Sequence, residues 1–293
     1  MLHEYADPNA IITAQELQGL LLRQELRIYD CTIHLDYEVG MGRPYTVRTG
    51  RTDYEAGHIP GSAHLDLQAD LSVESSPYSF TIPQADELSR RFAGAGIGDD
   101  TRVVLYARDK MQQATRVWWL LRYLGFDKAA ILDGGWTQWI QDGRPIWQGD
   151  RRYPAASSFT IKLRPDLFVG REKMLAAVGD KECCSLNALS TELHSGLDAR
   201  YGRPGRIPGS INVPAAALLN PDTNEFLPLN RAAEILETVG ATPDKQILNY
   251  CGGGIAATLD AFIQHQLGYP NIAVYDNSMS EWAGDDKLPI EVD

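Results

Sequence analysis

The chain of 293 residues lacks several features that would place it in a specialised class of protein. No stretch approaches the roughly 20 continuous apolar residues that a membrane-spanning helix needs. The N-terminal sequence MLHEYADPNA has no basic start followed by an apolar core, as a secretory signal would have. Positive charge is scarce, because 27 Lys and Arg stand against 39 Asp and Glu, a net charge of −12. Since binding to nucleic acid needs clustered positive charge, we do not expect this protein to bind nucleic acid. From the missing signal and the missing apolar stretch, we expect a cytoplasmic protein that does not bind membranes.

Cysteine and histidine are also few, and their spacing suits neither disulfides nor metals. There is no Cys-x-x-Cys pair, and the six histidines have no ligand spacing, so we expect no metal site. We interpret Cys31, Cys183 and Cys184 as reduced thiols that serve as small buried hydrophobic side chains. The fourth cysteine, Cys251, requires a separate argument because of the residues that follow it.

An internal repeat is the most informative feature that the sequence does contain. His58-Ile-Pro-Gly-Ser returns as Arg206-Ile-Pro-Gly-Ser, and the segment from Asp133 to Trp139 returns as the segment from Asp276 to Trp282. A repeat of roughly 145 residues indicates a duplicated domain, because the repeats of solenoid proteins run to only about 20–50 residues. We place the join in residues 141–159, and predict domains at 1–147 and 160–293.

Each half alternates short apolar runs with helical periods. This alternation predicts an α/β fold in which each half forms an open, mainly parallel sheet with helices on both faces. The predicted strands are Leu26–Tyr29, Val103–Tyr106, Ala129–Leu132, Cys183–Leu186, Ile247–Tyr250 and Ala273–Tyr275. The predicted helices are Thr13–Arg23, Gln84–Phe92, Thr115–Leu124, Arg171–Val178, Arg231–Val239 and Ala256–Leu267.

Cys251 lies where a predicted strand ends and a predicted helix begins, and three glycines follow it. Ligands of parallel sheets bind outside the carboxyl ends of the strands, so this turn lies at the functional edge. Without side chains in the way, the backbone amides of Gly252, Gly253, Gly254, Ile255 and Ala256 can surround an anion. Such a nest would stabilise a thiolate or a persulfide on Cys251. An unreactive cysteine followed by a flexible turn is an equally good interpretation of the loop alone.

The matching turn of the first half distinguishes between these interpretations. There the chain reads Tyr106-Ala107-Arg108-Asp109-Lys110, so the cysteine is an alanine and the glycines are large or charged side chains. A loop that only supported folding could have kept one chemistry in both copies. We therefore predict one reactive half and one half that shapes the cleft.

Taken together, the motifs resemble those of two-domain rhodanese-superfamily sulfurtransferases, the group that contains thiosulfate and 3-mercaptopyruvate sulfurtransferases. The resemblance covers almost the whole chain. It includes Gly57–Gly61 and Gly205–Gly209, the strand that leads into each loop, and the closing segments that end in tryptophan. It implies tandem rhodanese-like domains, of which the first is degenerate and non-catalytic. It also implies that Cys251 carries the sulfur in a site between the two halves, with the loop amides around it.

The resemblance further implies transfer in two steps through a covalent intermediate. The Cys251 thiolate would take the outer sulfur from a small anionic donor, thiosulfate or 3-mercaptopyruvate. It would then pass that sulfur to cyanide, a small thiol or a thioredoxin-like protein. No metal or organic cofactor is required for this chemistry.

The loop sequence leaves the donor open. Thiosulfate-type members commonly carry Arg-Lys after the cysteine and mercaptopyruvate-type members Gly-Ser-Gly, whereas this chain has three glycines. Arg200, Arg203 and Arg206 either supply positive charge for the donor from a nearby loop or are solvated loop residues.

Two other functions compete with the sulfurtransferase. Phosphatases of the same fold need Cys-x5-Arg, and this chain has Ala257 in place of that arginine. A non-catalytic persulfide-relay or binding module stays open as an alternative.

Overall fold

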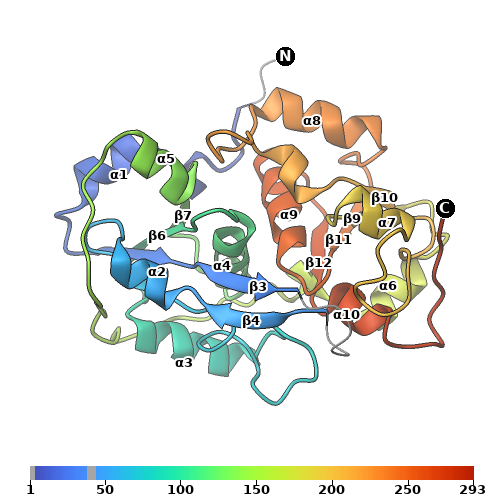
Figure 1. Cartoon of the computed structure of the whole chain (residues 1–293), viewed down its shortest axis with the longest axis horizontal. Coiled ribbons are helices and arrows are strands. Elements are labelled where there is room, and N and C mark those ends of the chain that lie inside the picture. The colour runs from blue at the N-terminus through green and yellow to red at the C-terminus, as the bar shows by residue number, and fades with distance from the viewer. Residues whose placement is uncertain (1–3, 38–43) are drawn as a thin grey trace.

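The computed structural model of this chain describes residues 4–37 and 44–293 and shows two α/β units that pack against each other (Figure 1). Every pairing within the two five-stranded sheets is parallel. The first sheet has the order β1-β7-β6-β2-β5 and the second the order β10-β9-β11-β12-β8. The second order repeats the first strand for strand, read from the opposite edge, which confirms the predicted duplication and the α/β fold. The strands are β1 (Ile11–Ile12), β2 (Leu26–Asp30), β5 (Ala63–His64), β6 (Arg102–Tyr106), β7 (Ala129–Leu132), β8 (Phe168–Val169), β9 (Cys183–Asn187), β10 (Ile211–Asn212), β11 (Gln246–Tyr250) and β12 (Ile272–Tyr275).

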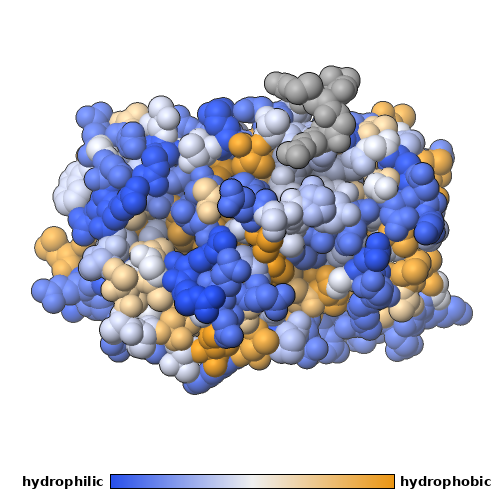
Figure 2. Space-filling model, turned by 90° about the horizontal axis from the view of Figure 1, so that it is seen from below, coloured by the Kyte–Doolittle hydropathy of each residue, from blue (hydrophilic) through white to orange (hydrophobic). Residues whose placement is uncertain are grey.

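The helices cover both faces of each sheet, as the side chains of single strands show. In β6, Val103 and Leu105 enter one apolar core while Val104 and Tyr106 enter another on the opposite face. A strand that is buried on both faces reads as a continuous apolar run, which is why these strands were predictable. The face that Figure 2 shows is mostly hydrophilic, with apolar residues in scattered patches. The helices are α1 (Ala14–Leu20), α2 (Arg51–Ala56), α3 (Ala85–Ala95), α4 (Gln112–Tyr123), α5 (Gly135–Gln141), α6 (Arg171–Ala177), α7 (Thr191–Ser195), α8 (Leu229–Thr238), α9 (Ala256–Gln266) and α10 (Ser278–Trp282), and short 3-10 turns cover Pro8–Ala10, Pro165–Leu167 and Ala215–Leu218.

Helices α4 and α9, which are equivalent in the two halves, pack against each other where the units meet. The rings of Trp118 and Phe262 lie edge to face with their centroids 4.9 Å apart. The hydroxyls of Thr115 and Thr258, one from each helix, are 2.9 Å apart and both are buried. One apolar core runs through this contact and includes residues of both sheets. The two units therefore share a core instead of being joined only by a linker.

An antiparallel hairpin interrupts the repeat in the first half. Strands β3 (Ile33–Asp36) and β4 (Thr46–Thr49) pair as a separate two-stranded sheet and extend towards the second unit (Figure 1). In the described residues the second half has no such hairpin after its equivalent strand, where α7 stands instead. The sequence analysis did not predict this hairpin.

The segment between the two sheets lies along the first unit. The amide of Ala156 donates to Ala93 O at 2.8 Å, and the amide of Lys162 donates to Leu124 O at 2.8 Å. The predicted domain limits, 1–147 and 160–293, stay predictions. In the part of the chain that the structure describes, no helix has both the length and the apolar character needed to cross a bilayer.

The buried pair Arg116–Asp276 ties α4 of the first unit to the second unit and yields a test of the packing. Arg116 is 1% exposed, and its guanidinium donates to Asp276 Oδ1 and to Phe80 O. Removing one partner strands a charge in the interior, so Arg116→Met should lower the free energy of unfolding by about 3 kcal/mol or more. The measurement is urea denaturation followed by circular dichroism.

Arg164→Met is the matched control, because Arg164 pairs with Asp127 at 2.6 Å on the surface. Exposed pairs contribute below about 1 kcal/mol, so this variant should unfold close to the wild type. Equal losses for the two variants would show that the buried pair does not hold the units together.

Candidate active site

Helix α10 holds the loop after β11 through the backbone. The amide of Cys251 donates to Ser278 Oγ at 3.0 Å, and Cys251 O accepts from the amide of Met279 at 3.0 Å. Gly252 O accepts from both the amide and the hydroxyl of Ser280, at 2.8 and 2.7 Å. The loop carbonyls therefore face α10.

Arg116 holds the far end of the same loop from the first unit. Its Nη1 donates to Gly254 O at 3.1 Å. Gly254 has a φ of +72°, and a Cβ there would lie 2.3 Å from Asp276 O. Both facts require glycine, since a positive φ is strained for other residues and the space for a side chain is filled.

The opposite side of the loop carries unpaired amides. In the described residues, no hydrogen bond takes the backbone N–H of Gly252, Gly253, Gly254, Ile255 or Ala256. Buried backbone donors without acceptors are rare, and α9 adds the partial positive charge of its N-terminus. The five amides are thus free donors in the loop that follows Cys251, which is 2% exposed.

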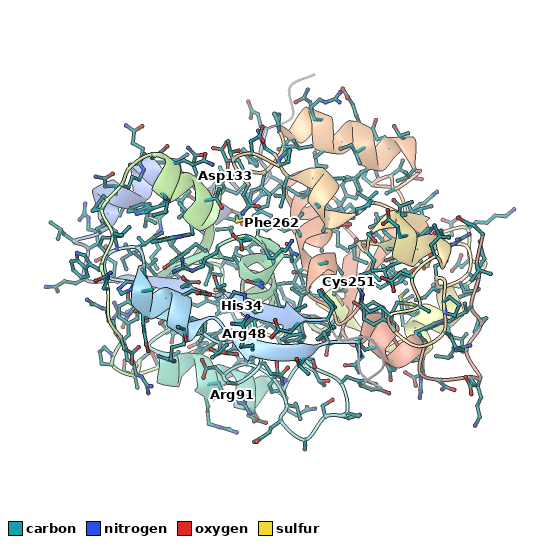
Figure 3. The ribbon with its side chains drawn as sticks, viewed as in Figure 1. His34, Arg48, Arg91, Asp133, Cys251 and Phe262 are labelled. Carbon is teal, nitrogen blue, oxygen red and sulfur yellow. The ribbon has the colours of Figure 1, made fainter. Side chains whose placement is uncertain are left out.

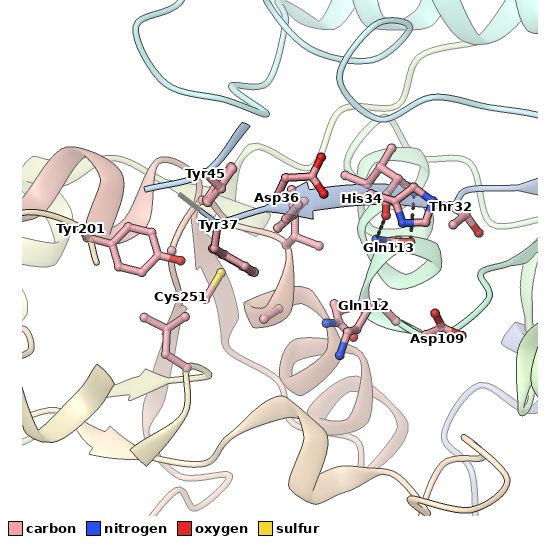
Figure 4. A pocket seen from close by; sticks show the side chains of 18 residues that line it. Thr32, His34, Asp36, Tyr37, Tyr45, Asp109, Gln112, Gln113, Tyr201 and Cys251 are labelled. Atoms are coloured by element: carbon pink, nitrogen blue, oxygen red, sulfur yellow. Dashed lines mark hydrogen bonds between the residues drawn. The ribbon is translucent and has the colours of Figure 1, made fainter. Parts of the chain in front are cut away.

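A cavity of about 270 Å³ opens beside the loop, between the two units. Figure 3 places Cys251 beyond the end of the β3–β4 hairpin, and Figure 4 shows its sulfur near Tyr37, with Thr32, Gln113 and Asp109 farther away. The cavity is therefore formed by the loop, the hairpin and the equivalent loop of the first half. The lining residues are Thr32, Ile33, His34, Leu35, Asp36, Tyr37, Tyr45, Asp109, Lys110, Gln112, Gln113, Leu189, Tyr201, Cys251, Gly252, Gly253, Ile255 and Ala256.

Two tyrosines fill the space that side chains at Gly252 and Gly253 would occupy. A Cβ on Gly252 would lie 1.8 Å from the hydroxyl oxygen of Tyr201, and a Cβ on Gly253 would lie 2.6 Å from that of Tyr45. Contacts below 3.0 Å are essentially never seen for a real Cβ. Glycine at these two positions therefore admits two phenol groups beside the loop, which the sequence analysis did not predict.

The hairpin and the first-half loop supply the charged groups of the cavity. His34 Nε2 lies 2.5 Å from Asp53 Oδ2, and Asp36 pairs with Arg48 at 3.1 Å. Asp109 and Lys110 line the cavity from the first-half loop. The sequence analysis considered the histidines only as metal ligands, and it is the β3–β4 hairpin that places His34 in the cavity wall.

None of the three predicted arginines lines the cavity. Arg206 pairs with Glu291 and Asp293 near the end of the chain, and its backbone pairs with Glu291 just as that of His58 pairs with Trp147. Arg206 is therefore equivalent to His58 in the repeat, since each residue forms an isolated antiparallel β-bridge at the same point of its unit.

The other two arginines are also held by the protein. Arg203 donates to the carbonyls of Trp282, Ala283, Asp285 and Leu288. Arg200 pairs with Asp198 at 2.8 Å, and its guanidinium carbon lies 4.2 Å from the centre of the Tyr37 ring. Only Arg200 thus contacts a residue of the cavity wall.

The equivalent turn of the first half is closed by its own side chain. Ala107 O accepts from the amide of Trp136 at 3.0 Å, as Cys251 O does from Met279. The Arg108 guanidinium lies 4.5 Å from the Trp136 ring and donates to Asp53 O and Gly57 O. The two turns therefore share this backbone hydrogen bond, but the first has Ala107 and Arg108 where the second has Cys251 and Gly252.

The other cysteines do not border the cavity. Burial raises the pKa of the Cys31 thiol well above its usual range, and burial raises the pKa of Cys184 to about 11. Burial and the neighbouring Asp180 also raise the pKa of Cys183. A raised pKa disfavours the thiolate in all three. Cys31 and Cys184 are buried as expected, whereas Cys183 is only half-buried.

The Ile-Pro-Gly-Ser motif has the same structural role in both halves. Tyr106, at the end of β6, bonds through its hydroxyl to the Ile59 amide and the Ser62 hydroxyl. Tyr250, immediately before Cys251, bonds to the Ile207 amide at 3.2 Å and the Ser210 hydroxyl at 2.6 Å. The motif therefore fixes the end of the strand from which each loop starts.

Comparisons with known proteins agree with this architecture. The thiosulfate sulfurtransferase of Gallus gallus is 28% identical over 247 residues, which are 82% of this chain and 83% of that protein. The 3-mercaptopyruvate sulfurtransferase of Escherichia coli K12 is 28% identical over 246 residues, 82% of this chain and 85% of that protein.

Solved structures show the same fold. The anaerobic ergothioneine biosynthesis enzyme from Chlorobium limicola, in complex with trimethyl histidine, has a TM-score of 0.81 at 21% identity, covering 98% of this chain and 71% of that one. The crystal structure of YnjE has a TM-score of 0.82 at 22% identity, covering 98% and 69%.

The family model described as rhodanese-like domain matches this chain twice, at residues 13–142 and 196–285, one match in each unit. With its two equivalent sheets and sulfurtransferases among its relatives, this chain belongs to the rhodanese family.

Proposed function

We propose that this protein is a sulfurtransferase that carries sulfur as a persulfide on Cys251. The observation that carries the proposal is the set of five free amides beside a cysteine that faces a cavity. Such donors stabilise negative charge on sulfur before, during and after transfer, and they need no rearrangement because α10 and Arg116 already hold the loop. Sulfur transfer is also what the thiosulfate and 3-mercaptopyruvate sulfurtransferases reported above are named for.

The first step is attack of the Cys251 thiolate on the outer sulfur of thiosulfate or 3-mercaptopyruvate. A new S–S bond forms to Cys251, the bond that joined this sulfur to the donor breaks, and sulfite or pyruvate leaves. The loop amides then hold the terminal sulfur of the Cys251 persulfide, which bears the charge that the thiolate lost.

The second step returns the cysteine to its thiolate. An acceptor such as cyanide or a thiol attacks the terminal sulfur, and the Cys251–sulfur bond breaks with its electron pair left on Cys251. Because Cys251 is 2% exposed among the described residues, this site favours small acceptors over a direct relay between proteins. A thioredoxin-like acceptor would have to bring its thiol into the cavity. A cytoplasmic location stays a prediction from the sequence.

The donor is recognised by groups outside the loop, because glycines 252–254 have no side chains. Lys110 lines the cavity, and Arg200 lies behind Tyr37, so these two cations are our candidates for attracting an anionic donor. Arg203 and Arg206, which the sequence analysis also put forward, engage carbonyls and carboxylates of the protein.

Replacing the cysteine tests the proposed function directly. Cys251→Ser should abolish thiocyanate formation from thiosulfate and cyanide, and pyruvate release from 3-mercaptopyruvate with a thiol, because a serine hydroxyl is neither a thiolate nor a sulfur carrier. Cys183→Ser, at a half-buried cysteine outside the cavity, is the matched control and should keep wild-type rates. Turnover of either donor by Cys251→Ser at the wild-type rate would refute the assignment.

The fit between Gly253 and Tyr45 tests whether the shape of the loop matters to the reaction. Gly253→Ala should lower kcat/KM roughly a hundredfold, since the new methyl group clashes with the Tyr45 hydroxyl and displaces the loop by a fraction of an ångström or more. Once that hydroxyl is removed, the nearest atom is Phe80 Cδ2 at 3.7 Å, an ordinary contact. The double variant Gly253→Ala, Tyr45→Phe should therefore recover most of the activity of Tyr45→Phe alone. Additive losses in this double-mutant cycle would contradict the proposed geometry.

A further inference from the structure

The tyrosines of this protein differ in whether their hydroxyls make hydrogen bonds within the protein. Most buried tyrosines donate to the protein, as Tyr29 does to Ala95 O at 2.7 Å and Tyr54 to Ser62 O at 2.7 Å. Tyr201 lines the cavity, and in the described residues its hydroxyl takes part in no hydrogen bond. Its hydroxyl end nevertheless lies against Gly252, the residue after the cysteine. Tyr201 thus presents a free O–H group to the cavity.

Three further observations qualify this hydroxyl as a donor. Figure 4 shows it pointing into the part of the cavity that Cys251 and Tyr37 face. Burial, followed by the charges of Tyr45 and Cys251, raises the pKa of Tyr201 well above its ordinary value, so the O–H keeps its proton at neutral pH. The absence of a side chain at Gly252 is what permits the approach.

We propose that Tyr201 is a catalytic residue whose hydroxyl donates a hydrogen bond to the carbonyl oxygen of 3-mercaptopyruvate as that oxygen gains charge. The inference rests on the sulfur transfer proposed above and adds a specific group for one of its two donors. The loop amides would hold the reacting sulfur, and the Tyr201 hydroxyl lies against Gly252 beside them, within the same cavity.

The chemistry explains why the two donors differ. When the Cys251 thiolate attacks the sulfur of 3-mercaptopyruvate, the S–S bond forms and the C–S bond breaks. The electron pair of the C–S bond passes to the carbon and carbonyl oxygen, which gives the enolate of pyruvate. The proton on the transferred sulfur then moves to the enolate carbon, leaving pyruvate and the anionic persulfide, so no outside oxidant or acid is consumed.

Transfer from thiosulfate does not create a new oxyanion that a hydroxyl could stabilise. Its S–S bond breaks with the electron pair left on the sulfur of sulfite, whose oxygens are already charged before the reaction. A hydrogen-bond donor that interacts equally with the ground state and the transition state does not accelerate the step. A hydroxyl that meets a newly formed oxyanion does, and losing one such donor costs about 10²–10³ in kcat.

The test is Tyr201→Phe, with kcat and KM measured for each donor and cyanide as the common acceptor. We expect kcat for 3-mercaptopyruvate to fall about a hundredfold or more and kcat for thiosulfate to fall less than about tenfold. Tyr123→Phe is the control, because this tyrosine packs edge to face on Phe168 outside the cavity and should keep both rates. Tyr201→Phe should fold normally, since it removes no hydrogen bond found among the described residues.

Three results would overturn the inference and leave the proposed function standing. The first is a Tyr201→Phe enzyme with unchanged rates, and the second is an equal loss for both donors, which would indicate a structural role. The third is a wild-type enzyme that turns over thiosulfate but not 3-mercaptopyruvate. A wild-type protein that transfers sulfur from neither donor would instead refute the proposed function, and this inference with it.

Discussion

The site depends on where the carbonyl groups of the Cys251–Gly254 loop are bound. Helix α10 holds the carbonyls of Cys251 and Gly252, and Arg116 of the other unit holds that of Gly254. With these carbonyls held, the amides of Gly252 to Ala256 have no acceptor among the described residues. Both units of the protein therefore contribute to holding this side-chain-free turn.

Duplication gives the protein two equivalent loops, of which one carries the cysteine and the other helps to form the cavity. The two halves share a strand order, a tyrosine bonded to Ile-Pro-Gly-Ser and a loop carbonyl bonded to the following helix. One copy has a cysteine and glycines, while the other has Arg108, which closes its own turn against Trp136. The first copy is not idle, because its hairpin and the residues around Asp109 form much of the cavity wall, and its Arg116 supports the active loop.

Much of this was predictable from the sequence, and the failures have physical causes. The central strands and main helices were found because burial on both faces or on one face leaves a clear apolar pattern. The edge strands β1, β5, β8 and β10 have two residues each, too few for any period. The sequence left the role of the three arginines open, because nearness in sequence to the site does not reveal that Arg206 pairs with Glu291 and Asp293. Tyr201 and Tyr45 reach the loop from separate segments, so only the fold could bring them together.

The most direct measurement of the central claim is the location of the transferred sulfur. The protein is incubated with thiosulfate or 3-mercaptopyruvate in the absence of an acceptor, digested, and mapped by mass spectrometry. The account predicts one added sulfur atom on the peptide that contains Cys251, which disappears when cyanide is added. Added sulfur on Cys31, Cys183 or Cys184, or turnover without any added sulfur on Cys251, would contradict it.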